Sequence, residues 1–328
     1  MNRRSLLPAL GLALLLAGCA STTGPVDLAT VHSVAPPVPG GIAVGKAAVP
    51  TPAAPSPSCG DPTASLRPPA VMPTPGQMPA GSTMAKIQQR GFLVAGVDQN
   101  TDLFGYRNPA DNKLEGFDID MVRDVAQAIF GDPNKVVYKA ISSAQRIPSL
   151  EAGSIDLVAR TFTITCDRIK QVAFSTVYFQ ASRQVLVPLD SSVKSFADLA
   201  HKRVCATTGS DSLGQAQGTA NAPVPVAVND WSDCLVMLQQ GEVDAVSTDN
   251  TILAGMVAQD PNTKIVGDSL AAEPYGIGIP KANQDFVSFV NGVLQEVRSN
   301  GSWVTSYQTW VKDRLGPTPA PPQPTYSN

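Results

Sequence analysis

The sequence predicts an α/β fold divided between two lobes. Between two Pro-rich segments, short β-rich runs alternate with amphipathic helical runs, which is typical of α/β domains. The alternation restarts after residues 184–188 as a second series of the same kind. At 328 residues, the chain is long enough for each lobe to bury its own core. We therefore expect two α/β lobes in series, followed by a final helix.

The first series contains three predicted strands and two predicted helices. They are strands at residues 92–97, 136–140 and 155–159 and helices at residues 117–129 and 146–152. The longer helix is indicated by apolar residues that recur on one face, namely Val122, Val125, Ala126 and Ile129. Gly153 is expected to end the shorter helix, because glycine readily adopts the left-handed conformation found at helix C-termini.

The second series repeats the pattern and is followed by a long amphipathic helix. Strands are predicted at residues 203–207 and 242–246. Ser195 is expected to cap a short helix, and Asp230 to cap a helix that ends at Gly241. The last helix, residues 284–298, carries apolar side chains at spacings of three and four, which predicts a core-facing stripe.

The N-terminus has the features of an export signal. Arg3 and Arg4 precede an apolar run at residues 6–17, and small residues lead directly into Cys19. This order is typical of a signal peptide, and the run is too short to span a bilayer comfortably. The pattern resembles a bacterial lipobox, which predicts removal of residues 1–18 and lipid attachment at Cys19. An ordinary signal peptide with an incidental cysteine is the alternative.

Two segments are too rich in Pro, Ala, Ser and Thr to maintain a helix. Residues 19–83 are expected to form a Pro-rich tether, and residues 315–328 a disordered tail. A flexible coil of about 60 residues would hold the folded part roughly 40 to 45 Å from the membrane.

Export to an oxidising compartment makes the four other cysteines candidates for disulfides. We favour Cys205 with Cys234, because the first lies on a predicted strand and the second on the following helix. Cys59 then remains for Cys166. The alternative is that some of these cysteines are buried thiols. Their spacing does not match a zinc site.

Composition argues against several classes of function. A formal net charge of −3, with 16% charged residues, provides no basic surface for a nucleic acid. The two histidines, His32 and His201, lie in a Pro-rich stretch and a polar run. They offer almost no material for a catalytic triad or a His-rich metal site. We therefore expect no metal and no cofactor.

Seven motifs follow one another along the folded part of the chain. The longest is Gly-Phe-Asp-Ile-Asp-Met-Val-Arg-Asp-Val-Ala-Gln-Ala-Ile at residues 116–129. The others lie at residues 144–150, 161–168, 172–175, 204–209, 243–249 and 275–280. Together they resemble the family 3 extracellular solute-binding proteins, the polar amino-acid receptors of ABC importers. The resemblance covers roughly residues 84–314, and the whole chain looks most like an actinobacterial glutamine-binding lipoprotein of that family.

This resemblance implies a two-lobe periplasmic-binding-protein-like (type II) fold with two hinge crossovers. Lobe 1 would comprise residues 84–179 and 277–314, and lobe 2 residues 184–271. The crossovers would lie near residues 178–183 and 272–275. The ligand would bind where the C-terminal ends of the strands of both lobes face each other, and its contacts to both would favour the closed form.

A free amino acid carries an α-carboxylate and an α-ammonium group. In a closed site the first requires a cationic partner and the second an anionic one. Arg168 follows a Thr-rich turn and can bind a carboxylate through both terminal nitrogens. The resemblance implies that Arg168, Thr161 and Thr163 bind the α-carboxylate and that Asp249 binds the α-ammonium. A surface arginine that opens a helix and a simple helix N-cap are the respective alternatives for Arg168 and Asp249.

Further ligand contacts are implied by the same resemblance. Asp98, just after the first strand, matches a family contact, with a loop-capping role as the alternative. Thr207, Thr208 and Ser210 lie in the turn that would meet the ligand from lobe 2. Thr207 stands where glutamine receptors can carry a lysine, which leaves a preference for glutamine open.

Arg146 bears on side-chain specificity. It resembles the arginine that glutamate/aspartate receptors direct at the distal carboxylate, where glutamine receptors have an apolar residue. We therefore expect Asp and Glu to bind at least as well as Gln and Asn. A solvated residue in the first turn of a helix is the alternative.

The function implied is that of a monomeric lipoprotein without enzymatic activity. It would lie on the outer face of the cytoplasmic membrane, bind a free polar amino acid and deliver it to an integral membrane permease. Presentation of the ligand to a membrane signalling protein is the alternative, because both roles use the same closure. Some relatives of the family are dehydratases, but the sequence offers no spare acid or base for such chemistry.

Overall fold

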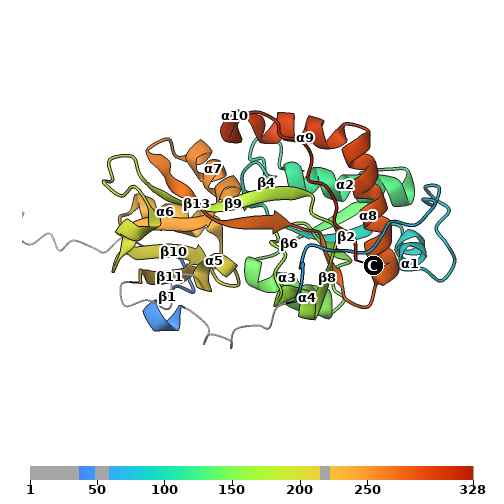
Figure 1. The fold of residues 1–328 in the computed structure, drawn as a ribbon, viewed down its shortest axis with the longest axis horizontal. Coiled ribbons are helices and arrows are strands. Elements are labelled where there is room, and N and C mark those ends of the chain that lie inside the picture. Colours follow the sequence, from blue (N-terminus) through green and yellow to red (C-terminus); the bar gives the residue numbers. More distant parts are fainter. Residues whose placement is uncertain (1–36, 49–58, 215–221, 328) are drawn as a thin grey trace, which may run out of the picture. The chain divides into compact units, whose positions relative to one another are not determined.

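The computed structural model describes residues 37–48, 59–214 and 222–327. They form two main sheets and one small sheet, with helices packed against them (Figure 1). None of the helices in these ranges has both the length and the apolar character that a membrane span requires. The expected signal peptide and Cys19 lie outside the described residues.

The first main sheet contains five strands in the order β6-β2-β7-β14-β8. Their bounds are β2 Leu93–Val97, β6 Val136–Ala140, β7 Leu157–Val158, β8 Val172–Phe174 and β14 Gly278–Pro280. Strands β6, β2 and β7 are parallel, whereas β14 runs antiparallel to β7 and β8. We call the part of the chain built on this sheet lobe 1. Its main helices are α1 Thr83–Arg90, α2 Phe117–Phe130, α3 Arg146–Glu151, α8 Gln284–Ser299 and α9 Ser302–Trp310.

The amphipathic stripes predicted for two helices face the core of lobe 1. On α2, the four predicted apolar residues are completely buried: Val122, Val125, Ala126 and Ile129. The stripe of α8 belongs to the same apolar cluster. Burial of one such side chain contributes about 1.5 to 3 kcal/mol, so this packing is what stabilises the two helices.

The second main sheet contains six strands in the order β1-β11-β10-β12-β9-β13. Their bounds are β1 Ala43–Val44, β9 Phe179–Pro188, β10 Arg203–Thr207, β11 Val224–Val228, β12 Ala245–Asp249 and β13 Thr263–Tyr275. We call the part built on this sheet lobe 2. Its helices are α5 Asp211–Gly214, α6 Trp231–Gln239 and α7 Asn250–Gln259. Strands β11, β10 and β12 are parallel, so their C-terminal ends meet at one edge.

Strands β9 and β13 connect the two lobes. They pair antiparallel from Thr263 and Pro188 at one end to Tyr275 and Phe179 at the other. The chain enters lobe 2 along β9 and leaves it along β13 (Figure 1). The next strand, β14, belongs to lobe 1. The paired ends of these strands include the positions where the sequence predicts the two crossovers.

The remaining elements are short. A three-stranded sheet consists of β3 Asn100–Thr101, β4 Gly105–Arg107 and β5 Leu114–Glu115. The other helices are the 3-10 turns Gly45–Ala47, Ser143–Gln145 and Phe196–Leu199, and α4 Arg168–Gln171 and α10 Lys312–Leu315.

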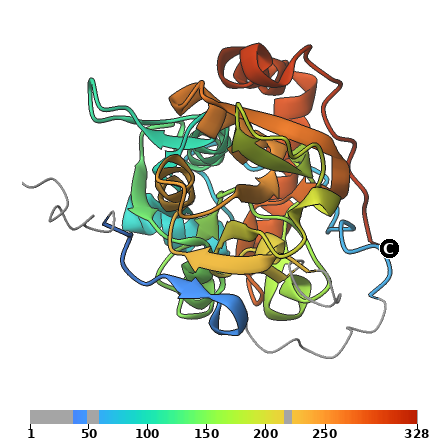
Figure 2. The same cartoon turned by 90° about the vertical axis from the view of Figure 1, so that its left-hand side faces the viewer.

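The described parts of the expected tether and tail are bound to the body, which differs from the expectation. Strand β1 pairs antiparallel with β11 at the edge of the second sheet, and Figure 2 shows it there in blue. Ser65 forms an isolated bridge with Tyr326 of the tail, and the guanidinium of Arg67 lies 5.3 Å from the ring centroid of Tyr326. Pro-rich chain forms no helix alone, but it can lie extended where neighbouring segments satisfy its backbone groups.

Both disulfides that the sequence analysis favours are present. Cys205 on β10 bonds to Cys234 on α6 within lobe 2. Cys59 bonds to Cys166, just before α4 in lobe 1. The first bond joins a strand to the helix that covers it, as expected, whereas the second attaches the described part of the tether to lobe 1.

Candidate functional site

Charged side chains are buried where the two lobes meet. Such residues are almost never fully buried in proteins unless they are paired, so they indicate either a structural ion-pair network or a site. Among the described residues, those no more than 8% exposed are Asp98, Asp118, Arg146, Arg160, Arg168, Arg183, Asp249 and Glu273.

Arg168 lies between the lobes at the start of α4. Its Nη1 donates to the carbonyl oxygen of Thr163 at 2.7 Å, and its Nη2 donates to the carbonyl oxygen of Gly209, in lobe 2, at 3.3 Å. Nη2 also lies 3.6 Å from Oδ1 of Asp211. With 8% exposure, Arg168 is not the surface residue that the alternative interpretation requires.

Arg146 reaches the same carbonyl group from α3. Its Nη2 donates to the carbonyl oxygen of Gly209 at 3.1 Å, and its Nε donates to that of Ser143 at 3.0 Å. Nη1 lies 3.3 Å and 3.4 Å from the carbonyl oxygens of Arg160 and Thr161. Two guanidinium groups of lobe 1 thus converge on one oxygen atom of lobe 2.

Positive charge is concentrated around Arg146. Burial, followed by the charges of Arg168 and Arg160, lowers the pKa of Arg146 well below its usual value. The guanidinium carbons of Arg146 and Arg168 lie 4.3 Å and 5.0 Å from the ring centroid of Phe162. Within the described ranges Arg146 forms no ion pair, since its hydrogen bonds go to carbonyl oxygens. This region would stabilise an added anion.

The two threonines expected in the carboxylate clamp are buried beside these arginines. Thr161 is 4% exposed, has a φ of 40°, and its backbone N–H donates to Oδ2 of Asp118 at 2.9 Å. Thr163 is 4% exposed and forms an isolated β-bridge with Tyr275 of the hinge strand. Because its carbonyl accepts from Arg168, Thr163 connects that guanidinium to the hinge.

Asp249 is the last residue of β12 and is 4% exposed. The hydroxyl of Tyr275 donates to its Oδ2 at 2.5 Å. Burial, with a further contribution from the negative charge of Asp211, raises the pKa of Asp249 to about 7. The residue occupies the N-cap position of α7, but its side chain makes no capping hydrogen bond there. Capping therefore does not explain why a carboxyl group is buried at this position.

Asp98 follows β2 and faces another arginine. Its Oδ1 accepts from the backbone N–H groups of Gln99 and Asn100 at 2.7 Å and 2.9 Å, and its Oδ2 accepts from the hydroxyl of Thr101 at 2.8 Å. Oδ2 also lies 2.8 Å from Nη2 of Arg160, a residue that the sequence analysis does not single out. The loop-capping role is thus present, together with a buried ion pair.

The three residues predicted at the end of β10 and in the turn after it make different hydrogen bonds. The hydroxyl of Thr207 donates to the hydroxyl of Ser143 in lobe 1 at 3.1 Å. Thr208 and Ser210 make their hydrogen bonds within lobe 2: Thr208 bonds to Val228, and Ser210 bonds to Thr207 and Leu213. Of these three predicted residues, Thr207 alone forms a hydrogen bond with a described residue of lobe 1.

Gly209 allows the lobes to approach each other at this turn. Its φ is 80°, and a Cβ atom built on it would lie 2.6 Å from the Cα of Ala144 in lobe 1. That distance is shorter than real Cβ contacts, so no side chain fits between the two backbones in this closed arrangement.

Two charged residues of the hinge strands, Arg183 and Glu273, are missed by sequence reasoning. Arg183 on β9 lies 2.6 Å from Oδ2 of Asp211 and pairs with Glu273 on β13. Burial, followed by the charges of Asp249 and Asp211, raises the pKa of Glu273 to about 8. The sequence shows only that Arg183 and Glu273 each lie within a β-rich run. The pairing of these two strands is what brings the two charges together.

A pocket of about 390 Å³ opens beside Asp98 and includes residues of both lobes. Its lining consists of Asp98, Gln99, Asn100, Ala140, Ile141, Ser142, Gln145, Asn229 and Asp230. In the part of the chain that the structure describes, no group of His, Cys, Asp and Glu is arranged to hold a metal ion.

Comparison with known families shows which family the chain belongs to. Residues 93–313 match the sequence model of the bacterial extracellular solute-binding proteins, family 3. The chain belongs to this family. Its members are solute-binding proteins, so the family resemblance noted in the sequence is confirmed.

Individual relatives bind amino acids. The chain is 36% identical over 232 residues to the ABC transporter glutamine-binding protein GlnH of Bacillus subtilis, covering 70% of this chain and 85% of the relative. It is 28% identical over 251 residues to the glutamate/aspartate import solute-binding protein of Escherichia coli, covering 73% and 82%. The relatives are thus amino-acid-binding proteins of importers, and they differ in the ligand that they are named for.

Solved structures confirm the two-lobe type II fold. An ancestral arginine-binding protein bound to glutamine has a TM-score of 0.63 and 34% identity, with coverage of 68% of this chain and 98% of that chain. The cysteine-binding protein of Campylobacter jejuni has a TM-score of 0.68 and 25% identity, with coverage of 72% and 95%. Members with this fold therefore bind ligands of different side-chain chemistry.

Proposed function

We propose that this protein binds a free polar L-amino acid between its lobes and delivers it to an ABC-type importer. We expect Glu and Asp to bind at least as well as Gln and Asn. The observation that carries the proposal is the convergence of Arg168 and Arg146 on the carbonyl oxygen of Gly209. Both guanidinium groups direct N–H donors at that oxygen. A ligand carboxylate requires such converging donors.

The α-carboxylate is assigned to Arg168. Thr161 and Thr163 belong to the same buried turn, and their positions support their expected place in this clamp. A planar guanidinium can bind both oxygens of a carboxylate, whereas the carbonyl oxygen of Gly209 occupies only one donor of each arginine. The ligand would therefore replace a neutral acceptor by an anionic one.

The α-ammonium is assigned to Asp249. Its carboxyl group is buried, and the hydrogen bond from Tyr275, followed by the charges of Arg183 and Arg168, keeps its pKa from rising further. A cation placed beside it would favour its ionised form. Asp98 is a second anion on the lobe 1 side, although its pairing with Arg160 leaves it less available.

The side-chain carboxylate is assigned to Arg146. This buried guanidinium forms no ion pair with another described residue, and two further guanidinium groups act on it. Burying an unpaired charge is costly, and a carboxylate supplied by the ligand would offset that cost. Thr207, and with it Thr208 and Ser210, would complete the site from lobe 2.

Closure would be the step that couples binding to delivery. We place lobe 1 at residues 84–179 and 277–314 and lobe 2 at residues 184–271, which is supported by the distribution of most strands between the two sheets, although β1 joins the second sheet from outside these bounds. Ligand contacts to both lobes would stabilise the closed form, and a membrane permease would recognise that form. A membrane signalling protein is the alternative partner, and uptake of labelled amino acid by a deletion strain separates the two.

The proposed location of the protein rests on the export signal predicted from the sequence. With lipid attached at Cys19, the protein would lie on the outer face of the cytoplasmic membrane as a monomer. Several acyl chains on one residue anchor a protein firmly, because about 0.8 kcal/mol is gained per buried methylene. Labelling of cells with a radioactive fatty acid would detect the modification, and Cys19→Ser should abolish it.

The binding site itself is tested by titration calorimetry. Wild-type protein should bind Glu and Asp, and Arg168→Gln and Asp249→Asn should each weaken binding by several kcal/mol, as is usual for one partner of a buried charge pair. Lys113→Gln is the matched control, because Lys113 is an exposed residue of an ion pair away from the site. Undiminished affinity in both site variants, with correct folding, would contradict the proposal.

A further inference from the structure

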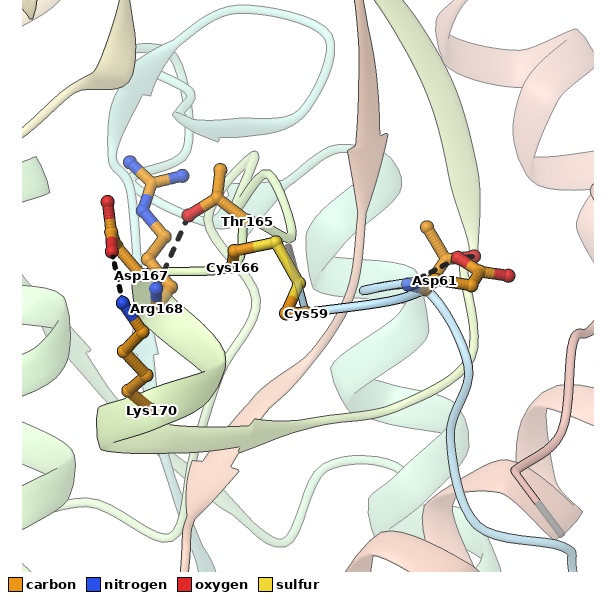
Figure 3. Close-up of a disulfide and its surroundings, with 8 residues drawn as sticks. Cys59, Asp61, Thr165, Cys166, Asp167, Arg168 and Lys170 are labelled. Carbon is orange, nitrogen blue, oxygen red and sulfur yellow. Dashed lines mark hydrogen bonds and ion pairs between the residues drawn. A yellow bond between two sulfur atoms is a disulfide. The ribbon is translucent and has the colours of Figure 1, made fainter. Parts of the chain in front are cut away.

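The Cys59–Cys166 disulfide joins a distant segment to the turn that carries Arg168 (Figure 3). We use the name N-terminal extension for residues 59–81, which precede α1. Cys166 is two residues before Arg168, and 107 residues separate the two cysteines. The covalent bond thus brings the N-terminal extension next to the start of α4.

The turn around Arg168 consists of one short helix with a few local contacts. Helix α4 contains only four residues; the Nζ of Lys170 donates to Oδ1 of Asp167 at 2.9 Å, and the backbone N–H of Ile169 donates to the carbonyl oxygen of Thr165 at 3.0 Å. The backbone N–H of Arg168 donates to the hydroxyl of Thr165 at 3.3 Å, which is long for a hydrogen bond. One helical turn is unstable alone, because helix nucleation is costly. The position of Arg168 therefore depends on contacts from outside the turn.

The N-terminal extension is itself attached to the core of lobe 1. Ser65 is buried, and its hydroxyl donates to the carbonyl oxygen of Phe174 at 2.7 Å. The side-chain amide of Asn291, on α8, donates to the hydroxyl of Ser65 at 2.8 Å and to the carbonyl oxygen of Leu66 at 2.7 Å. Cys59 is six residues before this anchor, so it is a suitable fixed point for the turn.

We propose that the Cys59–Cys166 disulfide is a positioning element of the ligand site, which holds the turn at residues 165–168 so that the guanidinium of Arg168 faces lobe 2. The inference rests on the proposed function, because it assigns the disulfide a role in amino-acid binding. The hydrogen bonds from Arg168 to Thr163 and Gly209 are 2.7 Å and 3.3 Å long. A shift of about 1 Å would take these donors out of range.

The two disulfides differ in a way that makes the proposal testable in folded protein. Cys59 and Cys166 are partly exposed, whereas Cys205 and Cys234 are completely buried. Thiol–disulfide exchange needs access to the sulfur atoms. Mild dithiothreitol should therefore reduce Cys59–Cys166 first: the bond takes up two electrons and two protons, and the reagent becomes a cyclic disulfide.

The first test needs no ligand. Hydrogen–deuterium exchange is measured on the full mature chain, as wild type, as the Cys59→Ser/Cys166→Ser variant, and after mild reduction. We expect faster exchange in peptides covering residues 163–171 and unchanged exchange in α8. Removal of Cys205 and Cys234 is the matched control and should leave residues 163–171 unaffected. Unchanged exchange in this turn after loss of Cys59–Cys166 overturns the proposal.

The second test is a double-mutant cycle on amino-acid affinity. It combines Cys59→Ser/Cys166→Ser with Arg168→Lys, which keeps the charge but loses the planar group. If the disulfide acts through Arg168, its removal lowers the affinity of wild type for Glu by about tenfold and that of the Arg168→Lys protein by much less. Equal losses in both backgrounds indicate a general effect on stability and overturn the proposal.

The two tests separate failure of this inference from failure of the proposed function. If wild type binds no polar amino acid, the function is wrong, and the exchange experiment still decides whether the disulfide positions the turn. If wild type binds and its affinity survives the loss of the disulfide, the function stands and the positioning role is rejected.

Discussion

The hydroxyl of Tyr275 donates a hydrogen bond to Asp249 at 2.5 Å, so that the end of hinge strand β13 contacts the end of β12 in lobe 2. The same hydroxyl lies 2.7 Å from the hydroxyl of Thr251 on α7. Tyr275 also bridges to Thr163, whose carbonyl accepts from Arg168. A short series of contacts through the hinge thus connects Asp249, assigned to the ligand's ammonium, with Arg168, assigned to its α-carboxylate.

Amino-acid affinity should rise with pH through neutrality. Burial raises the pKa of Asp249 to about 7, and the ligand's ammonium would lower it by favouring the ionised form. Binding then releases a proton, so affinity increases by up to about tenfold per pH unit below that pKa and levels off above it. Calorimetry in buffers of different ionisation enthalpy measures the released protons. Asp249→Asn is the control, and an equal release from that variant would contradict the assignment.

The stability of the ligand-free protein should fall as pH rises from about 5 to 9, in part because of Glu273. Its pKa is raised from 4.5 to about 8, so the folded state binds this proton more tightly than the unfolded state. The stabilisation is complete below the unfolded value and is lost as pH rises through about 8. Thermal melts of Glu273→Gln should show a smaller decrease than wild type. A decrease of the same size in both would show that other groups cause it.

Gly209→Ala should weaken binding strongly while both lobes remain folded. The φ of 80° costs a residue with a side chain about 1 to 2 kcal/mol, and the added Cβ would lie 2.6 Å from Ala144 across the lobe interface. Gly241→Ala is the matched control, because Gly241 has a φ of 70° in lobe 2 with no atom near its Cβ position. Small-angle scattering should detect ligand-induced compaction in the control and not in Gly209→Ala. Normal compaction of Gly209→Ala would show that the approach of the two backbones is not needed.

Arg146→Met should change ligand preference from acids toward amides. The substitution removes the positive charge assigned to the distal carboxylate, which should cost about 2 to 5 kcal/mol of affinity for Glu. Affinity for Gln should fall less, because its amide gains little from a cation. Competition titrations with Glu and Gln measure the ratio directly. Arg203→Met is the control, since Arg203 pairs with Glu242 at the opposite end of β10 from Thr207. An unchanged ratio of Glu to Gln affinity would show that Arg146 does not determine ligand specificity.

The fold was largely predictable where periodicity and burial agree. Strands at residues 136–140 and 203–207 have the predicted bounds, and the last helix ends within one residue of its predicted end. The strand predicted at residues 242–246 instead spans Ala245–Asp249, which makes Asp249 a strand residue. Strand β11 was not predicted, because its Pro225 reads as a break, and yet it pairs in parallel with β10.

Among the buried charged residues of the candidate site, sequence reasoning singled out those that lie in a motif. Arg146, Arg168 and Asp249 lie in family motifs, and all three are buried between the lobes. Arg160 and Arg183 were missed, because a lone arginine in a β-rich run carries no signal of its partner. The partners of Arg183 are 28 and 90 residues away along the chain.

Local order in the chain was sufficient to indicate the class of fold, a favoured pairing of Cys205 with Cys234 and the residue types that can bind a zwitterion, because these depend on short-range periodicity and chemistry. Folding alone decided which charges share a buried environment, where the lobes touch and that the Pro-rich segments lie against the body. These properties arise from contacts between residues far apart in sequence, such as Arg168 with Gly209 and Cys59 with Cys166.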